Sequence, residues 1–314
     1  MSVTRRELLM SAGLLTGGMA MGTVAAEPEV AAQLPLDQRV RYCLNASTVM
    51  GQKLPIEDFV DLAAKAGYQG IEPWIRDIQA YVDAGKSLPD LAKRIADHGL
   101  RVESTIGFAQ WIVDDDTRRK EGIETMKRDM DFVKALGGTH IAAPPVGAQQ
   151  KDAPSLDLFN VAERYAAVLE VGRQQGVVPQ VEIWGHSRNL SRLGEAVFVA
   201  TEAGDSDACI LPDIYHIYRG GSSLAGLGII SGAALHCFHF NDYPAAPPRE
   251  ELTDAFRVYP GDGAAPWAEI CQTLDRIQFS GAVSLELFNR DYWQQDPLIV
   301  ARTGLEKMKA VLSS

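Results

Sequence analysis

Four short stretches indicate the architecture: V-P-Q-V-E from Val178 to Glu182, C-I-L-P-D from Cys209 to Asp213, L-H-C-F-H from Leu235 to His239, and V-S-L-E from Val283 to Glu286. Each is a short apolar run, typical of a buried strand, that ends in a carboxylate or an imidazole. Helical patterns separate the runs, so we expect parallel strands whose C-terminal ends meet at one edge. Three carboxylates and one imidazole would form a site there for one divalent cation, Mn²⁺, Mg²⁺, Co²⁺ or Zn²⁺.

The rest of the chain repeats this alternation of strand and helix. Further strands are predicted at residues 41–47, 70–74, 100–106 and 139–143, and the four quoted runs lie in strands at 178–183, 208–214, 234–241 and 282–288. Helices are predicted at residues 55–66, 87–98, 118–136, 156–175, 193–203, 224–230, 266–277 and 297–312. Ser87 is a typical N-cap, and Gly67 and Gly176 are typical helix stops.

Eight strand–helix units predict an α/β fold, a single (β/α)₈ TIM barrel over residues 40–314, with the metal site at its C-terminal mouth. Such barrels carry their chemistry at that end. The alternative is a doubly wound sheet, which is disfavoured because no Gly-x-Gly-x-x-Gly turn follows the first strand.

The charge of the chain restricts its partners. Lys and Arg number 30 against 41 Asp and Glu, which gives a formal net charge of −11. Binding to nucleic acid or to an anionic membrane needs clustered positive charge, so neither partner is expected. A small-molecule substrate is expected instead, and the sequence leaves the formation of a homo-oligomer open.

The N-terminus has the pattern of a targeting segment. T-R-R-E-L-L-M, from Thr4 to Met10, precedes a weakly hydrophobic stretch rich in Gly and Ala that ends at Ala26. Paired arginines before a modest apolar region are typical of a twin-arginine export signal. We therefore expect a signal peptide at residues 1–26, a linker at residues 27–39 and a periplasmic protein.

The four cysteines are expected to be free. Cys43, Cys209 and Cys237 fall in predicted strands, where a buried thiol behaves as a small hydrophobic side chain, and the fourth is Cys271. Twin-arginine export carries folded proteins, so the fold would form in a reducing compartment.

Four motifs carry a resemblance to a known family. They are V-E-I-W-G-H (Val181 to His186), P-D-I-Y-H (Pro212 to His216), F-H-F-N-D (Phe238 to Asp242) and L-E-L-F-N (Leu285 to Asn289). With this spacing the chain resembles the xylose isomerase-like barrels of sugar isomerases and epimerases, and among them the inosose isomerases. The resemblance extends to the long loop from Glu251 to Gly263 and covers almost the whole chain after the N-terminal segment.

The resemblance implies the roles of the site residues. Glu182, Asp213, His239 and Glu286 would be the metal ligands, and Glu182 and Glu286 would also be the catalytic acid–base pair. Arg257 would contact the substrate. From their positions at or just after strand ends, further substrate contacts are expected from His216, His186, Glu72 and Asp242. Trp74, Phe108 and Trp111 would either wall the pocket, since sugars pack on aromatic rings, or belong to the core. Arg257 is expected to reach the substrate from the long loop after the seventh strand, so that its removal would leave metal content and folding intact. The alternative is a surface ion pair with Asp254 or Glu251.

The expected reaction is isomerisation or epimerisation of a keto-sugar or keto-cyclitol through a metal-stabilised ene-diolate. A lyase or dehydratase acting on a 3-keto-sugar or keto-glycoside would use the same chemistry and stays open. An apurinic-site endonuclease is disfavoured, because that activity uses a His-rich cluster of several zinc ions and the chain has only six His. A sugar-binding barrel without catalysis is disfavoured because both glutamates are intact.

Overall fold

A computed structural model describes residues 34–313 of the chain. The eight strands are β1 (Arg41–Asn45), β2 (Gly70–Glu72), β3 (Arg101–Val102), β4 (His140–Ala143), β5 (Val178–Glu182), β6 (Ile210–Leu211), β7 (Cys237–Phe240) and β8 (Ala282–Leu285). The segment that we expect to be a signal peptide lies outside the described residues.

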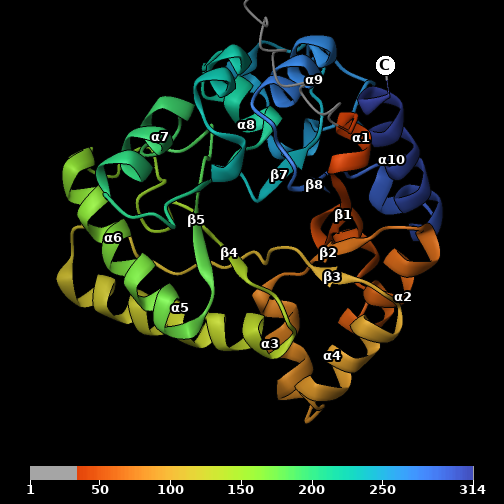
Figure 1. Cartoon of the computed structure of the whole chain (residues 1–314), viewed down its shortest axis with the longest axis horizontal. Coiled ribbons are helices and arrows are strands. Elements are labelled where there is room, and N and C mark those ends of the chain that lie inside the picture. The colour runs from red at the N-terminus through yellow and green to blue at the C-terminus, as the bar shows by residue number, and fades with distance from the viewer. Residues whose placement is uncertain (1–33, 314) are drawn as a thin grey trace, which may run out of the picture. The chain divides into compact units, whose positions relative to one another are not determined.

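Helices surround the strands, as Figure 1 shows. They are α1 (Leu36–Arg39), α2 (Ile56–Ala66), α3 (Ile75–Asp83), α4 (Leu88–Asp97), α5 (Asp116–Ala135), α6 (Leu158–Gln175), α7 (Leu193–Glu202), α8 (Ile214–Arg219), α9 (Trp267–Arg276) and α10 (Pro297–Leu312). Short 3-10 turns complete the loops, among them Leu224–Ile229 and Asp254–Phe256. Within the part of the chain that the structure describes, no helix is both long and apolar enough to cross a membrane.

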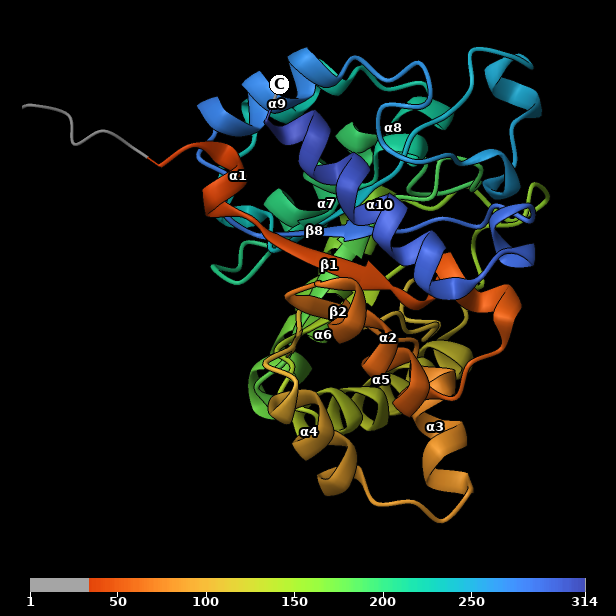
Figure 2. The same ribbon diagram turned by 90° about the vertical axis from the view of Figure 1, so that its right-hand side faces the viewer.

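The strands form two parallel sheets whose edges lie next to each other. One sheet has the order β3-β2-β1-β8-β7 and another the order β4-β5-β6, and Figure 2 shows β1 between β2 and β8. Parallel bridges at Ile210–Leu235 and Asp213–His239 join β6 to β7. The amide of Ala142 donates to the carbonyl of Thr105 at 2.9 Å and links the chain after β3 to β4. The prediction of a TIM barrel is therefore confirmed.

The local signals for several helices are also confirmed. Ser87 caps α4 by accepting from the amide of Asp90. Gly67 and Gly176 end α2 and α6 with φ of 98° and 76°, a conformation that suits glycine. Two helices, α3 and α8, were not predicted, and α1 forms at the end of the expected linker, where Leu36 is buried.

The core has two parts. The larger cluster lies between the strands and the surrounding helices, and the smaller one fills the barrel with Cys43, Ala142, Leu211, Cys237, Ala282 and their neighbours. All four cysteines are free and buried, as expected. Since side chains alternate along a strand, Cys43 and Cys237 share their inward face with Asn45 and His239, which lie closer to the C-terminal mouth.

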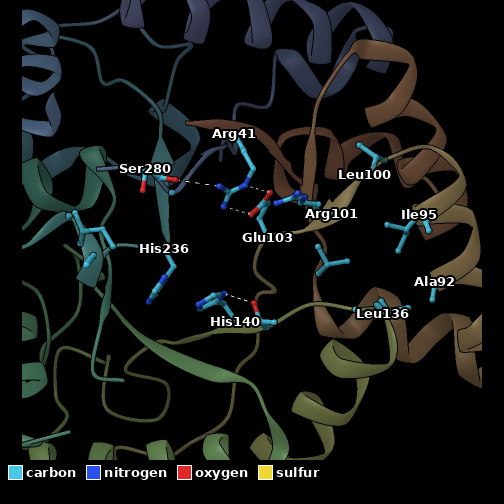
Figure 3. A pocket seen from close by; sticks show the side chains of 18 residues that line it. Arg41, Ala92, Ile95, Leu100, Arg101, Glu103, Leu136, His140, His236 and Ser280 are labelled. Carbon is cyan, nitrogen blue, oxygen red and sulfur yellow. Dashed lines mark hydrogen bonds and ion pairs between the residues drawn. The ribbon is translucent and has the colours of Figure 1, made fainter. Parts of the chain in front are cut away.

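The opposite end of the barrel has a cavity of about 710 Å³. Its lining includes Arg41, Glu103, His140 and His236 at the N-terminal ends of the strands. In Figure 3, Arg41 lies between Glu103, which it pairs through two hydrogen bonds of 2.7 and 2.8 Å, and the carbonyl of Ser280. The four predicted metal ligands lie at the other end of the strands and do not line this cavity.

Candidate metal centre

The barrel brings the four predicted ligands together at its C-terminal mouth. Glu182 is the last residue of β5, Asp213 follows β6, His239 lies in β7 and Glu286 follows β8. The amide of His239 donates to the carbonyl of Pro212 at 2.9 Å, and that of Glu286 to the carbonyl of Phe240 at 3.3 Å. This parallel register places the side chains side by side.

The imidazole of His239 is the centre of the group. Its Nδ1 lies 3.1 Å from Glu286 Oε2, 3.6 Å from Asp213 Oδ2 and 3.9 Å from Glu182 Oε1. Ligand atoms of Glu182, His239 and Glu286 all lie within 4.8 Å of one another, as a cation site requires. All of these side chains are buried.

The donor atoms fit a divalent cation. Among the described residues, Glu182 Oε2 and His239 Nδ1 are buried without a hydrogen-bond partner, so the close approach of Nδ1 to Glu286 lacks hydrogen-bond geometry. Buried polar atoms are normally paired, and an ion is one partner that can satisfy them. Oxygen donors with one nitrogen suit Mn²⁺, Mg²⁺, Co²⁺ or Zn²⁺.

The pKa values reflect a crowded, buried set of charges. Burial, opposed by His239 and reinforced by Glu286, raises the pKa of Glu182 to about 8. Burial also disfavours the charged forms of His239 and Asp213, but the surrounding charges prevail in both. The carboxylates of Glu286 and Glu72 raise the pKa of His239 well above its usual value, and Arg257 lowers the pKa of Asp213.

Arg257 lies in the loop after β7 and is buried, which excludes the alternative of a surface ion pair. Its side chain is only 1% exposed. The guanidinium Nη1 donates to Asp213 Oδ2 and to Glu286 Oε2, both at 2.7 Å, and Nη2 donates to Asp254 Oδ1 at 2.7 Å. Arg257 therefore joins two of the predicted ligands, and from these buried ion pairs we expect its removal to affect folding and not catalysis alone.

His216 connects Arg257 to the chain after β5. Its Nε2 lies 2.8 Å from Arg257 Nη2, and its Nδ1 accepts from the amide of Gly185 at 3.1 Å. Burial lowers the pKa of His216 to about 3. A neutral imidazole carries one ring proton, so it can accept from only one of these two donors at a time. His216 is thus a neutral group within the site.

His186 lies further out, at the rim. It is exposed, stacks on Trp184 with ring centroids 5.8 Å apart, and forms a second group of candidate metal ligands with His216 and Asp254. Its imidazole is accessible to a bound molecule, so its role in substrate binding stays a prediction.

Glu72 and Asp242 are enclosed by protein donors rather than open to a substrate. Both are fully buried. Asp242 accepts hydrogen bonds from the amides of Tyr243, Gly261, Gly263 and Ala265 and from the indole of Trp267. Asp242 is therefore an anchor of the loop after β7, not the substrate ligand that we expected. Glu72 accepts from the side chains of Asn45, Ser284 and His239.

Aromatic rings gather beside the site. The ring centroid of Trp74 lies 5.2 Å from that of Phe108 and 6.1 Å from that of Phe288. The ring centroids of Phe108 and Trp184 are 6.3 Å apart. Such rings suit the C–H faces of a sugar or cyclitol. Trp111, by contrast, is a core residue, since it is fully buried against Tyr165 and donates to the carbonyl of Pro144.

Sequence reasoning missed several polar members of the site. Asn241 donates to Asp213 Oδ2 at 2.9 Å and accepts from the amide of Tyr215, while Asp254 pairs with Arg257. Asn241 lies within the F-H-F-N-D motif, directly after β7. This strand-end position is the feature of the sequence that could have indicated its place in the site. Ser284, inside a strand, has no such signal.

The fold and this arrangement of strand-end ligands define an α/β-barrel with a candidate metal centre. The model of the xylose isomerase-like TIM barrel family matches residues 60–311, and the chain belongs to that family. An inosose isomerase of Bacillus velezensis is 24% identical over 275 residues, which cover 87% of this chain and 98% of the relative. A D-psicose 3-epimerase of Agrobacterium fabrum is 23% identical over 240 residues, 73% of this chain and 78% of the relative.

A solved structure shows the same fold. The structure of the IOLI protein with a binding zinc atom superposes with a TM-score of 0.79 at 24% sequence identity, and the match covers 87% of this chain and 98% of that protein. The likeness therefore extends over the whole barrel.

Proposed function

We propose that this protein is a divalent-metal-dependent isomerase or epimerase of a keto-sugar or keto-cyclitol, such as an inosose. The observation that carries the proposal is His239 Nδ1, buried and without a hydrogen bond, facing the carboxylates of Glu182, Asp213 and Glu286. The relatives named inosose isomerase and D-psicose 3-epimerase, and the zinc atom in the IOLI protein, support it.

The four residues would have two roles in a proton transfer, metal binding and acid–base catalysis. A cation bound by Glu182, Asp213, His239 and Glu286 would polarise a carbonyl and the adjacent hydroxyl of the substrate. Glu182 and Glu286 come from β5 and β8, which are not neighbouring strands, so they can reach a substrate from two sides. One carboxylate takes the proton from the carbon beside the carbonyl, and proton return from the same or the other carboxylate completes the reaction.

The position at which the proton returns decides the product. Return to the neighbouring carbon moves the carbonyl, whereas return to the opposite face of the same carbon inverts that centre. Elimination of a leaving group from the next carbon would instead make the protein a lyase or dehydratase. The proposal therefore predicts a product with the same mass as its substrate.

A substrate panel tests this. The Mn²⁺-loaded protein is incubated with inososes, ketohexoses and a 3-keto-glucoside, and the products are followed by NMR and mass spectrometry. A new isomer without change of mass supports the proposal. A product that has lost water or the aglycone would replace it with the lyase. No reaction across the panel by a protein that binds the cation would count against both.

Metal stoichiometry gives an independent test. We expect about one ion per chain by elemental analysis of metal-loaded protein, because the site offers four ligands around one point. Three tightly held zinc ions per chain would favour the endonuclease instead.

We also propose that the protein is exported to the periplasm. The proposal rests on the paired Arg5 and Arg6 before the apolar stretch that ends at Ala26. Residues 1–26 fused to a reporter should export it in a twin-arginine-competent cell. Replacing both arginines by lysine should keep the reporter in the cytoplasm, and unchanged export of that variant would contradict the assignment.

A further inference from the structure

Glu72 is a buried carboxylate that has no direct access to a substrate. It ends β2, is 0% exposed and lies opposite Asn45 in the register of β1 and β2. Its Oε2 accepts from Asn45 Nδ2 at 2.8 Å and from Ser284 Oγ at 2.7 Å. The thiol of Cys237 lies 3.8 Å from Oε1. Donors from β1, β7 and β8 thus enclose the carboxylate.

The remaining partner of Glu72 is the imidazole of His239. Nε2 lies 3.1 Å from Oε2 and 3.3 Å from Oε1 of Glu72. An ionised carboxylate can only accept hydrogen bonds, so Nε2 must carry a proton. In the neutral imidazole, the form that binds a cation, the Nδ1 atom on the other side of the ring is then the lone-pair donor, and it faces Glu182, Asp213 and Glu286.

We infer that Glu72 is a positioning residue, which fixes the tautomer and the ring orientation of His239 so that Nδ1 can ligate the cation. This inference rests on the proposed function, since it concerns the metal site of that function. A carboxylate behind a metal-binding histidine also makes the imidazole a stronger ligand. Glu72 therefore acts through His239. This differs from the substrate contact that we expected of it from the sequence.

A hydrogen-bonded chain holds Glu72 in place. Asn45 Oδ1 accepts from the indole of Trp74 at 3.0 Å and from the amide of Ser47 at 2.9 Å, which leaves its Nδ2 as the donor toward Glu72. The same Nδ2 lies 3.3 Å from Glu286 Oε1. Asn45 thus contacts both the carboxylate behind His239 and one proposed ligand, and Trp74 links this pair to the aromatic wall.

The test uses Glu72→Gln, which keeps the size of the side chain and removes its charge. A glutamine amide can also turn its NH₂ toward Nε2, which would favour the tautomer with a proton on Nδ1. Loss of such a partner typically weakens metal binding about 10- to 100-fold. We expect the Kd for Co²⁺ and Mn²⁺, measured by calorimetry and by the visible spectrum of Co²⁺, to rise by that factor.

Glu103→Gln is the matched control. Glu103 is a buried carboxylate close to the neighbouring strand β3, but it pairs with Arg41 at the opposite end of the barrel. Its replacement should change the melting temperature and leave metal affinity unchanged.

In the Zn²⁺-loaded wild type, ¹⁵N NMR should show a protonated Nε2 and a metal-bound Nδ1 for His239, and the Nε2 proton signal should shift or vanish in Glu72→Gln.

The outcomes separate the two proposals. Wild-type affinity and an unchanged Co²⁺ spectrum in Glu72→Gln would overturn the positioning role and leave the proposed function standing. A rise in KM with unchanged metal affinity would also overturn it, because it would place Glu72 on the substrate. A wild-type protein that binds no cation would contradict the proposed function itself and, with it, this role of Glu72.

Discussion

A single guanidinium connects two of the carboxylates that we assign to the metal. Arg257 Nη1 donates to both Asp213 and Glu286, and its pKa is raised well above the usual value because these neighbouring charges outweigh the effect of burial. Arg257 and a bound cation would therefore both compensate the negative charge of these carboxylates. If Arg257 is removed, the cation should contribute more to the stability of the fold.

This balance predicts the behaviour of Arg257→Ala. Without added metal, the variant should melt at a lower temperature than the wild type, because removing one partner of a buried ion pair costs about 3–5 kcal/mol. Mn²⁺ should then raise its melting temperature more than that of the wild type, since the cation pairs carboxylates that are otherwise uncompensated.

Arg219→Ala is the control for this experiment. Arg219 donates to the carbonyls of Leu252 and Glu250 in the same loop region and to no carboxylate of the site. Its removal should leave the response to Mn²⁺ as in the wild type. Equal Mn²⁺ responses in Arg257→Ala and Arg219→Ala would contradict the coupling.

Glu286→Gln separates proton transfer from ligation. The amide keeps an oxygen donor for the cation but cannot take up a proton, so turnover should fall by about 10²–10⁴, the range typical of a lost general base. Metal affinity should change much less. Steady-state kinetics on the accepted keto-sugar and calorimetry with Mn²⁺ measure the two effects.

The exposed Glu269 in α9 offers a neutral comparison. Glu269→Gln should match the wild type in both measurements. Near-normal turnover in Glu286→Gln would remove Glu286 from the acid–base pair and leave Glu182 as the one remaining carboxylate of that pair.

The predicted ligands were recognisable because charged residues stood at the ends of apolar runs. Glu182, Asp213, His239 and Glu286 meet at the mouth for that reason, since parallel strands end at the same edge. The roles of Glu72 and Arg257 depend on which neighbour each side chain meets across the barrel. Such contacts join residues as far apart as Glu72 and Ser284, and no local pattern encodes them.

At the scale of elements, the loop between β7 and α9 is built around Asp242. An antiparallel bridge between Asp242 and Val258 brings the loop back to the end of β7. A Cβ atom at Gly263 would lie 2.3 Å from Asp242 Oδ1, so only glycine fits there. The loop carries Arg257 and Asp254, and its anchoring therefore determines the geometry of the site.

Asp242→Ala should loosen this loop. Several backbone amides would lose their acceptor, and each buried unsatisfied donor costs about 1–3 kcal/mol. We expect a lower melting temperature and new protease cleavage within residues 244–263, followed by mass spectrometry. Asp262→Ala, in the same loop with an exposed pair to Lys307, is the comparison and should be cleaved as slowly as the wild type. Equal cleavage of the two variants would count against the anchor.

The elements themselves were largely predictable from periodicity and caps. Long amphipathic helices such as α2 and α4 have apolar faces and clear start and stop signals. The two helices that were not predicted, α3 and α8, each begin only three residues after the last residue of the preceding strand. The N-cap of α8 is Asp213, whose Oδ1 accepts from the amide of His216, while its Oδ2 accepts from Asn241 and Arg257 in the site. We interpreted Asp213 from the sequence as a ligand and did not consider it as a helix N-cap, so α8 was not predicted.

At the scale of the whole molecule, the two ends of the barrel differ in their chemistry. The C-terminal mouth gathers the proposed ligands, whereas His140 and His236 lie at the N-terminal end with ring centroids 4.2 Å apart. Burial, with smaller contributions from His236 and Arg41, lowers the pKa of His140 to about 3, and the pKa of His236 is lowered as well. Both imidazoles are therefore neutral in the folded protein at pH 7.

This pair predicts a pH dependence of stability. A histidine in the unfolded chain has a pKa of about 6.5. Below that pH the unfolded state therefore binds more protons than the folded state, and the free energy of unfolding decreases as the pH is lowered. The loss should extend from about pH 6.5 down to about pH 3. Urea denaturation should show a steeper loss in the wild type than in His140→Gln, and parallel curves would contradict this origin.

The central claim is proton transfer at a carbon beside a carbonyl, carried out by Glu182 and Glu286 at a metal site. The most direct measurement is hydrogen exchange at carbon, in which the Mn²⁺-loaded protein is incubated with an inosose or ketohexose in D₂O and the sugar is recovered for NMR and mass spectrometry. We predict deuterium at a carbon adjacent to the carbonyl, with none incorporated by metal-stripped protein or by the Glu182→Gln/Glu286→Gln double variant. Conversion of a substrate without deuterium, or equal exchange by the double variant, would contradict the account.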